Sequence, residues 1–271
     1  MEDALCKVMV MSSSLNLARF ASYLNRPTPI MPERLTLYTA KSCPFAHRVE
    51  IALAEAKADF KTYEIQDLRN KPQWYIDKVN PASKVPAIAY GGPDVPLDQP
   101  SPESLKLTES LILVELVADL FPSSNLLPTD PILRAKSRYF TEVVQSKLVP
   151  AWIGAIFSGG PLEPLYAALE AVQALLPADK PYALGDAYSA ADVTVTPFLA
   201  RMEVALKNDT GTFKEGEGIK AAEIIFFSER FARLARYLEA LKARESFKTF
   251  NTDYITEKYR FWVAERTASH H

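Results

Sequence analysis

Short segments in the first part of the chain alternate between apolar and polar residues. In Arg-Leu-Thr-Leu-Tyr at 34–38, for example, Leu35 and Leu37 share one face. Alternation with a period of two is typical of β-strands, because successive side chains of a strand point to opposite faces. The pattern predicts four strands, at residues 34–38, 60–65, 87–90 and 105–107.

Apolar residues between the first two predicted strands follow helical spacing instead. Phe45, Val49 and Leu53 recur every four residues, which predicts a helix that runs to about Lys57. A strand–helix–strand unit with a helix of this length joins parallel strands. A short helix ending near Val79 and another helix after the fourth strand complete a predicted order of β-α-β-α-β-β-α.

The second half of the chain shows no alternating pattern. Helical spacing recurs in five segments, at about 131–157, 162–176, 189–206, 222–243 and 252–264. The run from Phe121 to Pro131 contains three prolines and predicts a linker, and the polar run at 207–220 predicts an exposed loop. Ser189 and Asp192 have the spacing of a helix capping box. We therefore expect an N-terminal extension at 1–33, an α/β domain at 34–121, a linker at 122–130 and an all-helical domain at 131–266.

The composition excludes several classes of function. The 271-residue chain is 48% apolar and 24% charged, which is ordinary for a globular protein, and its net charge of −2 favours neither nucleic acid nor an anionic membrane as partner. The two cysteines, Cys6 and Cys43, lie far apart, so a reducing compartment is favoured over a disulfide framework. No apolar run is long enough for a bilayer span, and the start at Glu2 and Asp3 lacks a secretory signal. With a reducing compartment and no signal, we expect a cytoplasmic protein. Three histidines, two of them terminal, offer no metal-ligand spacing, so we expect no metal.

Candidate chemistry lies at Cys43, between the first predicted strand and the helix that follows. Pro44 suits the first helical position, where its missing N–H costs nothing, and this places Cys43 at the N-cap. The positive end of the helix dipole favours the thiolate, which is the reactive form of cysteine. Ser42 offers a second hydroxyl donor beside the thiol. The residues alone also allow Cys43 to be only a small buried hydrophobe.

Four motifs, in the same order, resemble the omega-like class of cytosolic glutathione transferases, including its fungal members. Cys-Pro-Phe-Ala-x-Arg at 43–48 resembles the active-site motif of that class, and Asn-Lys-Pro-x-Trp at 70–74 resembles its next signature. Lys-Val-Pro at 84–86 and Glu-Ser at 109–110 resemble its glutathione-binding segments. The resemblance covers about residues 34–265. It implies a thioredoxin-like α/β N-terminal domain that binds glutathione and an all-α C-terminal domain that lines the second-substrate pocket.

The resemblance also implies that glutathione is the co-substrate, bound by Phe45, Leu68, Lys71, Lys84, Val85, Pro86, Glu109 and Ser110. Ser110 at a helix start suits the γ-glutamyl carboxylate, Glu109 suits the ammonium group, and Lys71 suits the glycine carboxylate. The backbone of Val85, before a cis Pro86, would pair with the cysteinyl part as a strand edge does. The residues alone also allow simpler roles. Lys71 could be a charged side chain in solvent. Glu109 and Ser110 could only favour a helix start, and Val85 with Pro86 could only begin a strand.

A second-substrate pocket for a hydrophobic or aromatic electrophile is implied as well. Its candidate lining residues are Tyr139, Val143, Trp152, Phe157 and Met202. Each of them also fits the hydrophobic core. His47, one turn after Cys43, fits a base for the thiol or, more simply, a residue that orients the helix, and Arg201 is expected in a surface or interdomain ion pair.

The function implied by the resemblance is thioltransfer, or deglutathionylation, as a homodimeric detoxification enzyme. The Cys43 thiolate would form a mixed disulfide with glutathione, which a second glutathione resolves. Two alternatives stay open. In one, Ser42 activates bound glutathione by hydrogen bonding, which gives conjugation or peroxidase activity. In the other, the protein is a ligandin-type carrier of phenolic small molecules with weak catalysis.

Overall fold

The computed structural model describes residues 33–268, and side chains as far as residue 265. The predicted extension at 1–33 therefore lies, apart from its last residue, outside the described residues, as does Cys6. By their contacts the described residues form two units. The sheet unit comprises 33–40 and 59–109, and the helical unit comprises 41–58 and 110–268. The predicted domain boundaries near residues 121–131 stay a prediction.

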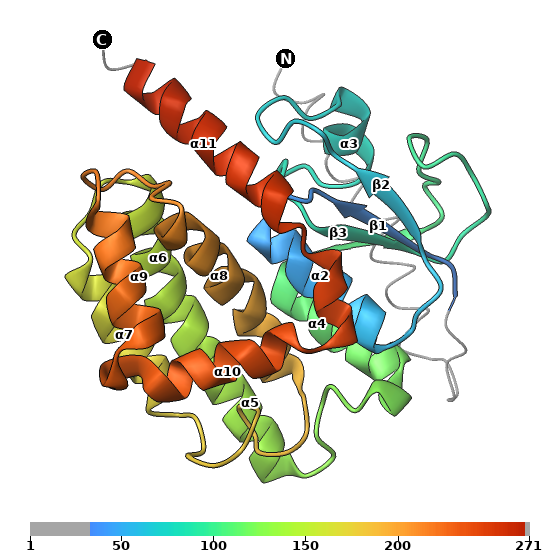
Figure 1. Ribbon diagram of the computed structural model, residues 1–271. Coiled ribbons are helices and arrows are strands. Elements are labelled where there is room, and N and C mark those ends of the chain that lie inside the picture. Colours follow the sequence, from blue (N-terminus) through green and yellow to red (C-terminus); the bar gives the residue numbers. More distant parts are fainter. Residues whose placement is uncertain (1–32, 269–271) are drawn as a thin grey trace, which may run out of the picture. The chain divides into compact units, whose positions relative to one another are not determined.

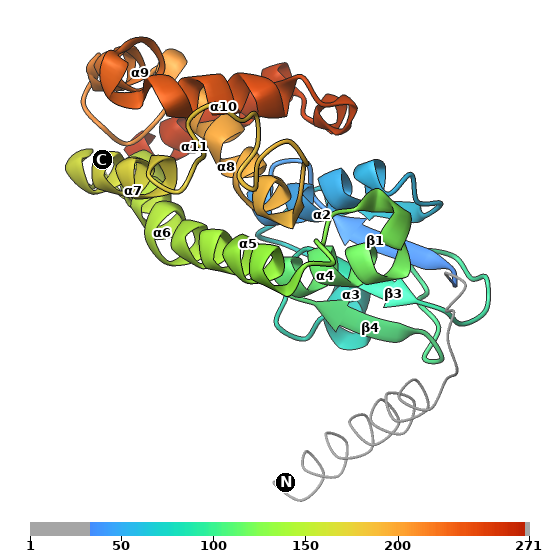
Figure 2. The same cartoon turned by 90° about the horizontal axis from the view of Figure 1, so that it is seen from below.

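The sheet unit contains the four predicted strands. They are β1 (Leu35–Thr39), β2 (Lys61–Glu64), β3 (Ala87–Tyr90) and β4 (Leu105–Thr108), in the spatial order β2-β1-β3-β4. Figure 1 labels β2, β1 and β3, and Figure 2 labels β4 beside β3. β1 pairs with β2 in parallel, as predicted, whereas β3 is antiparallel to both β1 and β4. Leu37 faces Thr62 on one side and Ile88 on the other. The strands are short, and the short helix α3 (Gln73–Lys78) is the only helix among the described residues of this unit.

Helices alone build the helical unit. They are α2 (Pro44–Glu55), α4 (Ser110–Leu120), α5 (Pro131–Val143), α6 (Val149–Phe157), α7 (Glu163–Gln173), α8 (Ala190–Lys207), α9 (Glu217–Phe227), α10 (Ala232–Lys242) and α11 (Thr252–Ala268). α8 is the central element, since it packs against α2, α4, α5, α6, α9, α10 and α11 (Figure 2). None of the described helices is both long and apolar enough to serve as a membrane span.

The start of α8 is fixed by the buried carboxylate of Asp192. The backbone N–H and the hydroxyl of Ser189 donate to it at 2.8 and 2.9 Å, which confirms the predicted capping box. The N–H of Ala183 and the hydroxyl of Tyr237 donate to its other oxygen at 2.8 and 2.7 Å. Four donors therefore compensate the burial of this carboxylate, as a buried polar group requires.

Two predicted helices differ from the structure. The segment predicted as one helix at 131–157 contains a π-helical turn, Val144–Leu148, between α5 and α6. Pro150 follows this turn, and because it has no N–H, the regular bond to the carbonyl of Ser146 is missing. The helix predicted at 222–243 is two helices, because the extended backbone of Ser228 ends α9.

The predicted loop at 207–220 is shorter than expected, because α9 already begins at Glu217. The carboxylate of Asp209 accepts the N–H groups of Gly216 and Gly218 at 2.6 and 2.9 Å, which holds the chain at the start of this helix. Gly216 has a φ of +81°, a conformation that glycine adopts without strain. A side chain–backbone bond across the loop thus starts a helix that hydrophobic spacing alone did not reveal.

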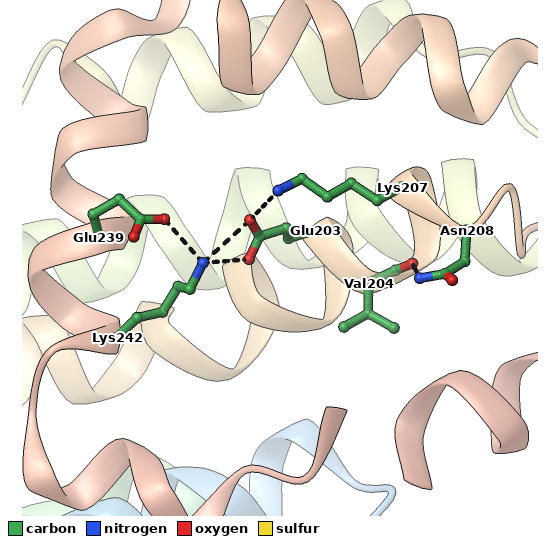
Figure 3. Close-up of polar contacts among 6 residues, drawn as sticks. All are labelled: Glu203, Val204, Lys207, Asn208, Glu239 and Lys242. Atoms are coloured by element: carbon green, nitrogen blue, oxygen red, sulfur yellow. Dashed lines mark hydrogen bonds and ion pairs between the residues drawn. The ribbon is translucent and has the colours of Figure 1, made fainter. Parts of the chain in front are cut away.

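A charged cluster links α8 to α10 (Figure 3). Glu203 pairs with Lys207 at 2.7 Å on its own helix and with Lys242 at 3.0 Å on α10. Lys242 also pairs with Glu239 at 2.9 Å. Because Glu203 is mostly buried whereas Glu239 is exposed, the first carboxylate makes the more constrained contacts.

Candidate active site

Cys43 stands at the N-cap of α2, and Pro44 occupies the first helical position, as predicted. Its φ and ψ of −84° and 118° are extended, and its carbonyl accepts the N–H of His47 at 3.1 Å to open the helix. Cys43 and Ser42 are each 8% exposed. The position of the thiol at the helix mouth is therefore confirmed, but the thiol is more buried than its place in the sequence indicated.

Burial changes the expected ionisation of Cys43. It raises the pKa of the thiol above its ordinary value, while the N–H of Ala46, the charge of Arg201 and the N–H of Phe45 act in the opposite direction. Glu50 adds to the rise. The expectation that the helix mouth alone yields a thiolate is wrong for this structure, because the loss of solvation outweighs the dipole and the N–H donors.

His47 is neutral, and its tautomer follows from its partners. Arg201 Nη1 lies 3.0 Å from His47 Nδ1, and because a guanidinium only donates, Nδ1 accepts. Nε2 therefore carries the proton and donates to Thr249 Oγ1 at 2.9 Å. Burial and Arg201 keep the pKa of His47 well below its ordinary value. Both ring nitrogens are thus engaged, which leaves no lone pair for Cys43 and favours the orienting role.

Arg201, on α8, is 1% exposed, so the surface half of the expected surface or interdomain ion pair is wrong, and the hydrogen bonds found for it go to neutral acceptors. It donates to the carbonyls of Lys41 and Ser42 at 2.8 and 3.4 Å, and its guanidinium lies 5.2 Å from the ring centre of Phe250. The two carbonyls belong to the residues that immediately precede Cys43. A charged residue on a helix is usually exposed, so nothing in the sequence marked this one as buried.

Arg48 connects the Cys-Pro-Phe motif to Ser110, which is the first residue of α4. Its Nη1 donates to Ser110 Oγ at 3.2 Å and to Gln145 Oε1 at 3.1 Å. The guanidinium lies 5.3 Å from the ring centre of Phe45 and 4.7 Å from that of Phe198. Burial lowers the pKa of Arg48 to about 9. Two predicted glutathione contacts, Phe45 and Ser110, therefore share one buried arginine within the helical unit.

The other predicted glutathione contacts belong to the sheet unit. The Val85–Pro86 bond is cis, as the resemblance implied. The carbonyl of Lys84 accepts the hydroxyl of Tyr75 at 2.6 Å and the amide of Asn80 at 2.8 Å, so the backbone is fixed just before this bond.

Lys71, Leu68 and Glu109 complete that set. Lys71 Nζ donates to the carbonyl of Leu68, so these two predicted contacts lie together. Glu109 has a φ of +68°, which is strained for a residue with a side chain and typical of functional positions.

The predicted pocket residues fall into different environments of the helical unit. Tyr139 is 62% exposed on α5, Val143 is buried and Met202 has no exposed surface. Trp152 and Phe157 do meet, with ring centres 5.0 Å apart and edge to face. This pair is therefore the part of the predicted lining that the structure brings together.

Sequence reasoning missed the rest of this aromatic cluster. Phe198 contacts Trp152 at 5.4 Å between ring centres, and Tyr259 and Trp262 of α11 contact Phe157 at 5.2 and 6.1 Å. The spacing of three residues between Tyr259 and Trp262, on one helix face, was the available signal.

A groove of the helical unit lies away from these residues. It measures about 540 Å³ and is lined by Lys147, Pro150, Ala151, Pro164, Ala167, Ala168 and Ala171. Apart from Lys147, its lining residues carry no ionisable or nucleophilic side chain. Residues 33–265 also contain no group of three or more His, Cys, Asp or Glu side chains able to hold a metal ion.

Comparison with known proteins agrees with this geometry. Residues 42–120 match the family model "Glutathione S-transferase, N-terminal domain", and residues 162–240 match "Glutathione S-transferase, C-terminal domain". The crystal structure of glutathione transferase Omega 1C from Trametes versicolor is 58% identical with a TM-score of 0.83, over 86% of this chain and 98% of that chain.

Two further relatives extend the comparison. Glutathione transferase Omega 2S from Trametes versicolor, in complex with 2,4-dihydroxybenzophenone, is 44% identical with a TM-score of 0.78, over 83% of this chain and 97% of that chain. Glutathione S-transferase L1 from Arabidopsis thaliana is 32% identical over 185 residues, which are 66% of this chain and 71% of the relative. The chain therefore belongs to the glutathione S-transferase family, whose co-substrate is glutathione, and to its fungal omega-like class.

Proposed function

We propose that this glutathione transferase is a thioltransferase that removes glutathione from mixed disulfides through Cys43. The observation that supports this most directly is the place of Cys43 at the N-cap of α2, where the N–H groups of Phe45 and Ala46 act on the sulfur. These donors stabilise a thiolate once it forms. The buried thiol must therefore lose its proton before or during the attack.

The reaction takes two thiol exchanges. The Cys43 thiolate attacks the glutathione sulfur of a mixed disulfide, an S–S bond forms between Cys43 and glutathione, and the substrate leaves as a thiolate that takes up a proton. The thiolate of a second glutathione then attacks this new bond, releases Cys43 and yields oxidised glutathione. Each cycle thus consumes one free glutathione: its sulfur and the glutathionyl sulfur taken from the substrate leave together as oxidised glutathione, and the substrate sulfur leaves as a thiol.

Replacement of Cys43 by serine tests the proposal. We expect Cys43→Ser to lose thioltransfer with a glutathionylated peptide, and mass spectrometry of the unmodified enzyme to trap glutathione on Cys43. Ser42→Ala serves as the matched control and keeps its rate. Full activity in Cys43→Ser together with loss in Ser42→Ala would instead support the alternative in which Ser42 activates glutathione for conjugation or peroxidase chemistry.

Binding of an aromatic small molecule is a second candidate function. It is supported by the edge-to-face pair of Trp152 and Phe157, and by the buried indole N–H of Trp152, for which residues 33–265 offer no hydrogen-bond partner. A buried donor without a partner is costly, and a ligand oxygen would satisfy it. The relative Omega 2S was solved with a dihydroxybenzophenone. Titration with that compound should quench tryptophan fluorescence less in Trp152→Phe, and an equal quench would argue against this site.

A homodimer, a cytoplasmic location and a role in detoxification complete the proposal. Exposed apolar side chains on α4 and α5, namely Ile112, Ile132 and Tyr139, support a second copy of the chain as partner of this face. Light scattering should give twice the 30.2 kDa mass of the chain, and Tyr139→Glu should lower it toward the monomer. A monomeric mass for the unmodified protein would refute the dimer.

A further inference from the structure

Two buried polar groups near Cys43 have no role in the exchange steps above. Arg201 is 1% exposed, and the acceptors found for it are all neutral: the carbonyls of Lys41, Ser42 and Pro197, and Nδ1 of His47. Tyr259 of α11 is also 1% exposed, and its hydroxyl has no hydrogen-bond partner within the described part of the chain. A buried guanidinium without an anion and a buried hydroxyl without a partner both cost free energy.

His47 does not supply the missing negative charge. It accepts one hydrogen bond from Arg201 and donates one to Thr249, so it is neutral and leaves the guanidinium charge uncompensated. The guanidinium of Arg201 lies over the ring of Phe250, which attracts the cation only through the quadrupole of the ring and carries no net charge. Among the residues that the structure describes, the charge of Arg201 therefore lacks a counter-charge in direct contact.

Cys43 is the group that can provide this counter-charge. Arg201 holds the carbonyls of the two residues before it, and the charges of Arg201, Tyr259 and Cys43 act on one another. Deprotonation of the thiol would turn a lone buried cation into an ion pair, which is the cheaper buried state. The hydroxyl of Tyr259 makes no hydrogen bond to the thiol among the described residues, and it is a buried donor free to turn to the same anion.

We propose that Arg201 and Tyr259 are positioning residues that hold the negative charge of the Cys43 thiolate. This inference rests on the proposed thioltransfer. It also assists the second exchange step, because Cys43 leaves the mixed disulfide as an anion beside Arg201. A stabilised thiolate is the better leaving group.

Other charged groups act on Cys43 as well. On α2 itself, Glu50 opposes ionisation, and Arg48 is a second cation whose charge interacts with the thiolate. Arg48 is likewise buried with neutral acceptors, but it donates to Ser110 and Gln145. Arg201 instead donates to the carbonyls of the two residues that precede Cys43. Glu50, Arg48 and neutral His47 are therefore the other titratable groups found to act on the sulfur or to contact Arg201.

The pH dependence of Cys43 alkylation tests the inference without catalysis. In the full chain carrying Cys6→Ser, the rate of reaction with iodoacetamide is measured between about pH 6 and 10.5, a range that spans the ordinary cysteine pKa. We expect the midpoint to rise by about half a pH unit in Tyr259→Phe and by about one unit in Arg201→Gln, with Arg201→Lys in between. Tyr254→Phe, on the same helix, is the matched control and keeps the midpoint.

Unchanged midpoints in folded Tyr259→Phe and Arg201→Gln would overturn the inference. If Arg201→Gln does not fold, as its melting curve would reveal, Tyr259→Phe decides alone, since it removes only one hydroxyl. Thioltransfer is measured on the same samples. If the midpoint shifts in the variants but the unmodified enzyme shows no thioltransfer, the proposed function is refuted and this inference stands. If the unmodified enzyme is active but the midpoint does not shift, only the inference is refuted.

Discussion

Replacing Asp192 by alanine removes the acceptor that four donors share. The hydroxyls of Ser189 and Tyr237 can turn to other partners, but the backbone N–H groups of Ala183 and Ser189 cannot, and both residues are buried. Each stranded donor costs about 2 kcal/mol, so the free energy of unfolding should fall by about 4 kcal/mol in Asp192→Ala. Because α8 is central to the helical unit, the whole unit should report the loss.

Urea denaturation followed by circular dichroism measures this change. Tyr237→Phe removes one of the four donors and should cost about 1 kcal/mol. Glu239→Gln, at the exposed end of the cluster in Figure 3, serves as control and should cost about 0.5 kcal/mol or less. A fall below about 1 kcal/mol for Asp192→Ala, at an unchanged denaturant slope, would mean that the buried N–H groups find other acceptors and that the reasoning is wrong.

Three other predictions concern α2 and the segment 245–250. Because burial raises the pKa of Cys43, the thioltransfer rate of the unmodified enzyme should still be rising at about pH 9; a plateau near neutral pH would contradict this. Arg244 binds Glu55 through both carboxylate oxygens, so Arg244→Gln should cost about 1–2 kcal/mol in urea and loosen residues 245–250 in hydrogen exchange. Because the pKa of His47 is lowered in the folded protein, only the unfolded chain protonates this imidazole as the pH falls below about 6.5. The free energy of unfolding should therefore decrease by up to about 1.4 kcal/mol for each pH unit below that point, and less steeply in His47→Gln. An equal slope in that variant would exclude His47 as the cause.

The sequence predicted the elements whose signal is local. Strand alternation such as that of Leu35 and Leu37, the Cys43–Pro44 helix start and the Ser189–Asp192 capping box all depend on residues close in the chain. Each was confirmed. Periodicity and capping therefore suffice to order the elements of this fold.

What the sequence could not predict depends on contacts between distant segments. Arg201 and Arg48 are arginines on helices, a residue type that usually lies on the surface, yet residues from several helices bury both of them. The pKa of Cys43 likewise follows from its burial, which no local pattern encodes. The break at Ser228 was missed because apolar spacing continues across it.

The π turn before Pro150 has a geometric consequence for the aromatic cluster. A bond from residue i to i−5 accommodates one residue more than a regular turn, and one residue corresponds to about 100° of helix rotation. Everything after Leu148 is therefore rotated about the axis relative to α5, including Trp152, whose ring meets Phe198 at 5.4 Å. The extra residue in the π turn, rather than a change of side chain, thus sets the direction in which α6 points the indole of Trp152. A homologous chain without this residue would need aromatic side chains at other positions to form the same cluster.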